Sequence, residues 1–180
     1  ENQYKKLYQS HPRLAAHLSI FGEDVALTEV VDWLRDLKFK QLEIKIEGDI
    51  LSQITAFINQ DGFLPNETKL VEVSSEGVFF NNSDGSLVSI DNLSDGYRSI
   101  LSMTLELIRQ MQIAYNTNDL FTEDGTQVKM PGVVLIDEID SHLHPTWQLK
   151  IGRWFREHFP QIQFIVTTHS PLICQAADIG

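Results

Sequence analysis

The chain has 180 residues, 42% of them hydrophobic, and a formal net charge of −11 at pH 7. This length and composition are ordinary for one soluble globular domain with its own core. The acidic balance argues against a protein that grips nucleic acid through its overall charge, so any phosphate site must be local. Because the single cysteine permits no internal disulfide, and no apolar run approaches the ~20 residues that cross a bilayer, we expect a cytoplasmic protein without membrane contact.

The first part of the chain has the period of helices and then of strands. Apolar side chains recur at helical spacing after Asp24 and again over Ile50–Ile58, before the turn signal Asp61–Gly62. Turn residues at Asn81–Gly85 then join two of three short β-type runs, which predicts a small antiparallel hairpin or meander. The three runs are Lys69–Val73, Gly77–Phe80 and Leu87–Ile90.

A long amphipathic helix is predicted to begin at Ser94 and to end before a polar loop at Asn116–Lys129. Ser94 can cap this helix, and the free N–H groups at the helix amino terminus favour an anion such as phosphate. By itself, Ser-Asp-Gly before a helix is more often only a cap and a turn. The apolar face of the helix comprises Ile100, Met103, Leu107, Ile108, Met111 and Tyr115.

The carboxyl-terminal part predicts a strand, a helix and a second strand. Val133–Ile136 and Gln163–Val166 are near-continuous apolar runs, as expected for parallel strands covered on both faces. Both strands release polar residues at their carboxyl ends, the edge at which α/β sheets bind ligands. Pro145 starts the helix between them. Its inward side chains are expected to be Trp147, Ile151, Trp154 and Phe155.

Asp137 and Glu138 follow the first of these strands directly. A stiff strand end holds both carboxylates in place, a pattern typical of a site where one carboxylate belongs to the shell of a magnesium ion and the next orients a water for attack on phosphorus. The plainer alternative is a helix start whose acidic residues favour its dipole. His169 follows the second strand, where it can donate to a phosphate oxygen. Since parallel strands are joined by right-handed crossovers, these groups are expected side by side.

In order and spacing, the motifs resemble the carboxyl-terminal half of an ABC-type ATPase head. Four stretches carry the resemblance: the signature in LSDGYRS (93–99), Walker B in VVLIDE (133–138), the D-loop in DSHLHP (140–145) and the switch histidine in TTHS (167–170). The sequences of these motifs are most similar to those of the AAA-family ABC ATPases. These include the OLD nucleases, RecF-like and SMC-like heads, and the ATPase subunits of Septu and retron anti-phage systems.

The resemblance implies an α/β fold: the C-terminal lobe of a P-loop NTPase, with parallel strands, flanking helices and a small antiparallel hairpin. It implies that Asp137 helps to hold Mg²⁺ through water and that Glu138 polarises the attacking water. His169 would contact the γ-phosphate of ATP in cis. Ser94 and Gly96 would contact the γ-phosphate of ATP bound to a second head, because two heads sandwich the nucleotide in this family.

The signature departs from the usual pattern in its middle. Asp95 replaces a glycine and is expected either near phosphate or pointing away, where it would serve the helix dipole. Tyr97 and Arg98 stand where the usual signature continues with a polar residue. Arg98 is the basic residue that we expect near phosphate.

The D-loop also departs from the transporter pattern. His144 stands where an aspartate is usual, and Ile139 replaces the usual proline, as in OLD-like ATPases. These changes favour a defence or DNA-maintenance protein over a transporter subunit. The resemblance places Asp140, Ser141 and His142 at the interface between heads, where they would relay the state of one site to the other.

No glycine of the chain is followed by Lys and then Ser or Thr, so the GxxxxGK[ST] loop that cradles phosphates is absent from it. We therefore predict that the chain supplies half of an ATP site and is inactive alone. Residues 1–68 are expected to be a helical segment returning from an insertion, and residues 69–180 the lobe with the four motifs. The chain opens without an initiator Met, and we expect it to be part of a larger ATPase; a separate subunit that completes a partner's P-loop is the alternative.

The predicted function is ATP hydrolysis with Mg²⁺ by heads that form a homodimer or higher oligomer and control a nuclease or DNA-bound partner. Which of these partners applies stays open. One rival is a zinc- or manganese-dependent hydrolase or nuclease, although Pro145 begins a helix directly after its ligands and no further His or Cys cluster completes them. Its ligands would be His142, His144, Asp137 and Asp140. The other rival is a catalytically dead head that only dimerises or holds a nuclease.

Overall fold

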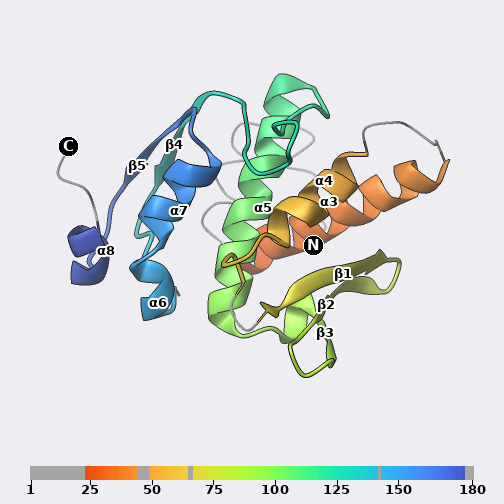
Figure 1. Cartoon of the computed structure of the whole chain (residues 1–180), viewed down its shortest axis with the longest axis horizontal. Coiled ribbons are helices and arrows are strands. Elements are labelled where there is room, and N and C mark those ends of the chain that lie inside the picture. Colours follow the sequence, from red (N-terminus) through yellow and green to blue (C-terminus); the bar gives the residue numbers. More distant parts are fainter. Residues whose placement is uncertain (1–22, 44–48, 65–66, 142, 177–180) are drawn as a thin grey trace.

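The computed structural model describes residues 23–43, 49–64, 67–141 and 143–176. Figure 1 shows α5 in the middle, with α3, α4 and an antiparallel sheet on one side and a strand–helix–strand unit on the other. Within these ranges no helix is both long and apolar enough to span a bilayer. The elements in chain order are α3 (Glu23–Glu43), α4 (Ile50–Ile58), β1 (Lys69–Ser74), β2 (Gly77–Asn81), β3 (Leu87–Ser89), the 3-10 helix η2 (Ile90–Asn92), α5 (Asp95–Tyr115), β4 (Gly132–Ile136), α6 (Pro145–Gln148), α7 (Ile151–His158), β5 (Ile162–Val166) and α8 (Pro171–Ala176).

Helices α3 and α4 bury the apolar stripes that the sequence predicts. Asp49 begins α4, and its carboxylate accepts hydrogen bonds from the N–H groups of Leu51 and Ser52 at 3.1 and 3.3 Å. This cap satisfies two of the N–H groups that have no partner inside the helix. The two helices expected from the apolar spacing are confirmed, whereas residues 1–22 and 44–48 lie outside the described part and the return from an insertion stays a prediction. The buried side chains include Val30, Leu34 and Leu37 of α3 and Ile50, Leu51, Ile54, Phe57 and Ile58 of α4.

The predicted antiparallel meander is confirmed, with strand order β1–β2–β3. Gly85, in the turn between β2 and β3, has φ +80°, a conformation that glycine adopts without steric cost, and its N–H donates to the carbonyl of Asn82 at 2.9 Å. Leu70, Val78 and Phe80 are buried. Helix α3 packs against β1 and β2, so the small sheet closes one side of the core.

Helix α5 lies against α3. Its apolar face is buried at Ile100, Ile108 and Met111, whereas Tyr115 in the last turn is exposed, contrary to the prediction. Tyr115 ends the helix, and its hydroxyl donates instead to the carbonyl of Pro131. The predicted face therefore holds along the helix and fails at its end.

Strands β4 and β5 pair in parallel, in register from Gly132 opposite Ile162 to the last residue of each strand. The crossover between them is broken into α6 and α7, where the sequence predicts one helix, but its four apolar side chains are buried as expected. The ring of Phe164 in β5 stacks on Phe155 of α7, with ring centroids 4.5 Å apart and planes 8° apart. One face of the sheet is thus covered by α7.

The other face of this sheet is exposed, contrary to the expectation that both faces are covered. Val133 and Leu135 of β4 expose 59% and 68% of their surface, and Ile165 of β5 exposes 51%. Alternate residues of a strand point to opposite faces, so these three share the face turned away from α7. Among the described residues, nothing covers these aliphatic side chains enough to bury them.

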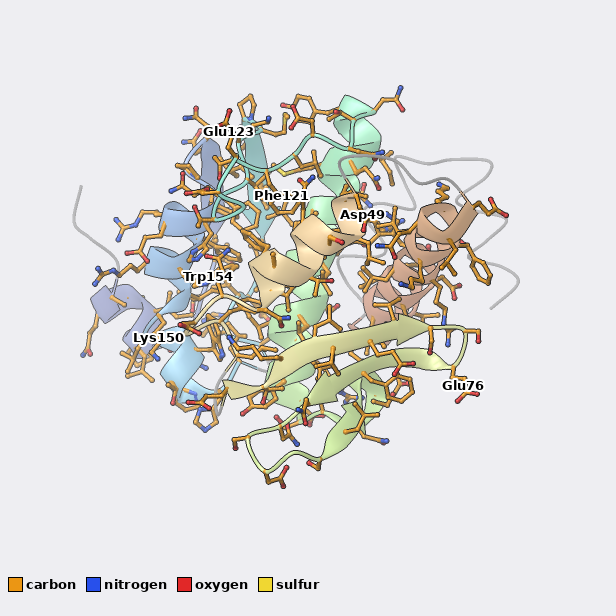
Figure 2. The ribbon with its side chains drawn as sticks, turned by 45° about the vertical axis from the view of Figure 1, so that its right-hand side comes forward. Asp49, Glu76, Phe121, Glu123, Lys150 and Trp154 are labelled. Carbon is orange, nitrogen blue, oxygen red and sulfur yellow. The ribbon has the colours of Figure 1, made fainter. Side chains whose placement is uncertain are left out.

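The segment between α5 and β4 contributes to the core, although the sequence predicts a polar loop. Leu120, Phe121 and Val128 are buried, and the latter two pair as an isolated antiparallel bridge. The ring of Phe57 in α4 lies 5.3 Å from that of Phe121 and 5.9 Å from that of Trp154 in α7. Figure 2 shows Phe121 beside α4 and Trp154 on α7 of the strand–helix–strand unit. These aromatic contacts join that unit to the helical half.

Candidate functional site

Two loops meet at the carboxyl ends of β4 and β5. Beyond the strands, the N–H of Thr167 donates to the carbonyl of Ile136, and the N–H of Ile139 donates to the carbonyl of Thr167, both at 3.0 Å. The loop after β4 carries Asp137, Glu138 and Asp140, and the loop after β5 carries His169. The parallel register therefore sets the two loops side by side, as the crossover rule predicts.

The hydroxyl of Thr167 lies between the two acidic residues of the predicted Walker B stretch. It donates a hydrogen bond to the carboxylate of Asp137 and accepts one from the N–H of Glu138 at 2.8 Å. A hydroxyl can do both at once because it carries one donor and two acceptor sites. Sequence reasoning gave Thr167 no role; the only signal was a hydroxyl residue directly after an apolar strand.

Glu138 has φ +49°, in the left-handed region that non-glycine residues rarely adopt. Its carboxylate lies 3.8 Å from Nε2 of His169 and accepts a hydrogen bond from the Ser141 hydroxyl at 3.4 Å. The side chains of His169 and Glu138 are 87% and 58% exposed, so water and a ligand can reach both. The structure thus brings together the two residues predicted to be catalytic, on a strained backbone of the kind that occurs at functional sites.

Asp140 is tied to the loop after β5, which carries the predicted switch histidine, His169; this loop, residues 167–170, is called the switch loop below. Its carboxylate accepts hydrogen bonds from the Thr168 hydroxyl and from the N–H of His169, the latter at 3.1 Å. The Thr168 hydroxyl, and to a smaller degree the His169 N–H, lower the pKa of Asp140 below its usual value, while partial burial opposes this shift. Thr168 in turn accepts from the N–H of Ser170 at 3.0 Å. Asp140 is therefore an ionised acceptor directed at the switch loop.

His144 acts as the N-cap of α6, where its Nδ1 accepts from the N–H of Thr146 at 3.3 Å. Gln148 of α6, which sequence reasoning missed, joins the D-loop to the switch loop. Its side-chain N–H donates to the carbonyl of Leu143 at 2.9 Å, and its side-chain oxygen accepts from the Ser170 hydroxyl at 2.7 Å. A glutamine in a helix carries no signal of such a contact until the two loops are known to meet.

The signature stretch lies at the start of α5, beside the antiparallel sheet (Figure 1). In the sequence it precedes the loops after β4 and β5. Ser94 is at the N-cap, but its hydroxyl makes no capping hydrogen bond, so the predicted side-chain cap is wrong; its carbonyl instead accepts from the N–H groups of Tyr97 and Arg98. Asp95 is in the first turn and forms an ion pair with Arg98 at 2.7 Å. This placement fits the alternative in which Asp95 serves the helix dipole. A contact of Ser94 or Gly96 with nucleotide stays a prediction.

The donor set at the end of β4 fits a magnesium ion. Asp137 is exposed and presents carboxylate oxygens, the hard ligands that Mg²⁺ takes, and the open setting leaves room for the waters that the ion keeps. Asp137 would hold the ion. In the part of the chain that the structure describes, no three His, Cys, Asp or Glu side chains gather as a metal-binding group. His142, one ligand of the rival zinc or manganese site, lies outside that part.

Comparison with known proteins identifies relatives. The family model described as "AAA domain, putative AbiEii toxin, Type IV TA system" matches residues 5–175. The chain is 44% identical over 91 residues to "Retron Ec83 probable ATPase" of Escherichia coli, which is 51% of this chain and 16% of that protein. It is 38% identical over 157 residues to "Septu protein PtuA" of Bacillus mycoides, which is 86% of this chain and 19% of the relative. A second "Septu protein PtuA", of Bacillus thuringiensis, is 33% identical over 122 residues, 66% of this chain and 29% of the relative.

The chain spans less than a third of the length of these relatives. A solved structure described as "Structural biochemistry of ATP-driven dimerization and DNA stimulated activation of SMC ATPases" is similar over 73% of this chain and 79% of its own, with a TM-score of 0.44 and 17% identity. That likeness is too distant to bear on the fold. The family match, which covers nearly the whole chain, and the observed strands and helices confirm the resemblance to an ABC-like AAA ATPase and its α/β fold class. The chain belongs to this family of AAA domains.

Proposed function

We propose that the chain provides the signature, Walker B and switch half of an ATPase head that binds and hydrolyses ATP. One observation carries the proposal: Glu138, on a left-handed backbone at the end of β4, lies 3.8 Å from the switch histidine His169. To position a water for attack on a terminal phosphate, a site needs a carboxylate and a hydrogen-bond donor that are exposed and fixed in orientation. Membership of the AAA family supports the same reading.

Each side chain has a proposed role in this reaction. Glu138 accepts a hydrogen bond from the attacking water and orients it. His169 donates an N–H to a γ-phosphate oxygen in the same head. Asp137, oriented by the Thr167 hydroxyl, holds Mg²⁺ through water. When bound, the ion supplies positive charge that stabilises the charge on the phosphate oxygens.

The signature stretch is proposed to act on a second head. The exposed N-cap residue Ser94 and Gly96 would contact the γ-phosphate of ATP held by that head, since the hydroxyl of Ser94 is not used for capping. Arg98 lies in the same first helical turn, paired with Asp95, and would respond to phosphate charge. Of the D-loop residues, Asp140 and His144 are proposed to lie near the nucleotide. Asp140, Ser141 and His142 are proposed to lie at the interface of the homodimer or higher oligomer.

A P-loop half, in the same polypeptide or in a separate subunit, is proposed to complete each head. The chain lacks a GxxxxGK[ST] loop. The exposed aliphatic face of β4 and β5 supports the proposal, because parallel sheets are normally covered on both faces. The greater length of the relatives agrees with it.

We further propose a role in anti-phage defence, in which closing of the heads on ATP controls a nuclease or a DNA-bound partner. Support comes from the retron and Septu relatives. Recovery of a nuclease with the tagged ATPase would favour the first partner, and ATPase stimulation by added DNA would favour the second.

Replacing Glu138 with Gln tests the ATPase proposal. In the ATPase that joins this chain to a P-loop half, Glu138→Gln is expected to bind nucleotide as the wild type does and to lower steady-state phosphate release by at least about 100-fold, because general-base catalysis contributes about 10²–10⁴-fold. Glu76→Gln is the matched control, since Glu76 is an exposed glutamate in the β1–β2 turn (Figure 2). Unchanged phosphate release in Glu138→Gln would remove the general-base assignment. Phosphoester hydrolysis by this chain alone with zinc or manganese would favour the metal-dependent hydrolase instead.

A further inference from the structure

We infer that Asp140 is a positioning residue that clamps the switch loop of its own head and thereby orients His169. The inference rests on the proposed ATPase function. It differs from a role at the interface between heads, because the contacts that carry it lie within one chain. The carboxylate of Asp140 reaches residues 28 and 29 positions further along the chain, in the loop after β5.

Both contacts converge on one carboxylate oxygen. Oδ1 of Asp140 accepts from the Thr168 hydroxyl and, at 3.1 Å, from the backbone N–H of His169. A charged acceptor makes such bonds shorter and stronger than a neutral one. The bond to the N–H fixes the peptide plane from which the His169 side chain departs. This matters because the imidazole itself is 87% exposed, so few packing contacts hold it in place.

The carboxylate is not needed to begin the next helix. Ser170 caps the start of helix α8. Its hydroxyl accepts a hydrogen bond from the N–H of Leu172 at 3.2 Å, and its carbonyl accepts one from the N–H of Cys174 at 3.3 Å. The groups that Asp140 binds precede Ser170 and belong to the segment that carries the switch histidine. The clamp therefore acts on the position of His169 rather than on the start of α8.

Asp140 also links the D-loop, to which it belongs, to the loop after β5. Its exposed neighbour Ser141, in the same D-loop, donates to Glu138 at 3.4 Å. A displacement of the D-loop would move the acceptor of the His169 N–H and so the imidazole. His169 would then leave its place beside Glu138 without any change in the residues that bind nucleotide elsewhere.

The test is a set of variants in the ATPase that joins this chain to its P-loop half. Asp140→Ala is expected to lower kcat for ATP by at least about tenfold, since a displacement of about 1 Å in a positioned group costs up to about 100-fold, and to leave KM within about twofold. Asp140→Asn keeps an oxygen acceptor for both donors and is expected to retain kcat within about threefold of the wild type. Asp124→Ala is the matched control and should not change kcat. Asp124 likewise accepts from a threonine hydroxyl, that of Thr122 at 2.6 Å, and from a backbone N–H, that of Thr126 at 3.0 Å.

Amide hydrogen exchange of His169 tests the clamp without reference to activity. Its N–H should exchange faster in Asp140→Ala and at the wild-type rate in Asp140→Asn and Asp124→Ala. If Asp140→Ala does not fold, Thr168→Val removes one of the two contacts from the other loop and should lower kcat in the same way. Unchanged exchange of the His169 N–H, unchanged kcat, or a loss confined to KM would overturn the inference. The ATPase proposal itself would fail if Glu138→Gln hydrolysed ATP at the wild-type rate. That result does not depend on the exchange rate of the His169 amide, so the two failures can be told apart.

Discussion

The Thr167 hydroxyl donates a hydrogen bond to the carboxylate of Asp137, so a residue after β5 orients the first acidic residue after β4. The same oxygen accepts the N–H of Glu138 at 2.8 Å. One side chain thus sets the direction of one carboxylate and the backbone of the next. The geometry of the two acidic residues depends on a neighbour 30 positions further along the chain.

Thr167→Val is expected to lower ATP turnover by about 10- to 100-fold, the usual cost of losing a residue that orients a metal ligand. Valine has the shape of threonine but leaves Asp137 without this donor and the N–H of Glu138 without this acceptor. Thr167→Ser keeps the hydroxyl and should stay within a few-fold of the wild type. Steady-state phosphate release in the complete ATPase measures both variants. Equal rates for the valine and serine variants would contradict the orienting role.

The hydrogen bonds to Asp140 predict a specific response to acid. Because the Thr168 hydroxyl lowers the pKa of Asp140 below 3.8, the stabilisation from its charged form is complete above 3.8 and is lost as the pH falls through the lowered folded-state pKa. The ¹³C chemical shift of the Asp140 carboxyl group should therefore keep its ionised value from neutral pH down to about 4 and change only below it. An NMR titration of that carbon measures the midpoint, and Thr168→Val, which removes the donor that lowers the pKa most, should move the midpoint upward. A midpoint at or above 3.8 would be inconsistent with the observed hydrogen bonds.

A buried ion pair on α5 predicts a loss of stability. Nε of Arg109 lies 2.7 Å from Oε2 of Glu106, and the two side chains are only 8% and 6% exposed. Arg109→Met removes the positive partner of a buried carboxylate and should lower the free energy of unfolding by about 3–5 kcal/mol. Urea denaturation measures this change. The double variant Arg109→Met/Glu106→Leu should recover part of the loss, because the buried carboxylate of Glu106 is removed as well. Recovery should be incomplete, since Arg109 also pairs with the carboxylate of Glu29 at 3.9 Å.

The control for that prediction is the Arg153–Glu157 pair of α7, which has the same 2.7 Å distance but is 78% and 53% exposed. Solvent screens exposed pairs, so Arg153→Met should not measurably change the urea midpoint. If the Arg109 and Arg153 variants were equally stable, burial would not be what makes the α5 pair matter.

The sequence predicts the elements that carry the site better than it predicts the contacts within it. The apolar runs before Asp137 and before His169 correctly indicate two parallel strands. The strand pattern can be read from each run alone, and the crossover rule then sets the two strands side by side. The roles of Thr167 and Gln148 are invisible there, since each depends on which residues meet across the two loops. The exposed face of β4 could not be predicted from the sequence either, because an apolar strand has the same residue pattern whether one or both of its faces are covered.

The parallel pairing of β4 and β5 also bears on how the protein folds. Asp140 and the His169 N–H that it binds are 29 positions apart, and the segment between them forms α6, α7 and β5. Closing a loop of this length costs less entropy than closing a longer one, by about 0.6 kcal/mol for each halving of the loop length. During synthesis, the acidic residues and the histidine can therefore come together as soon as this one crossover has left the ribosome.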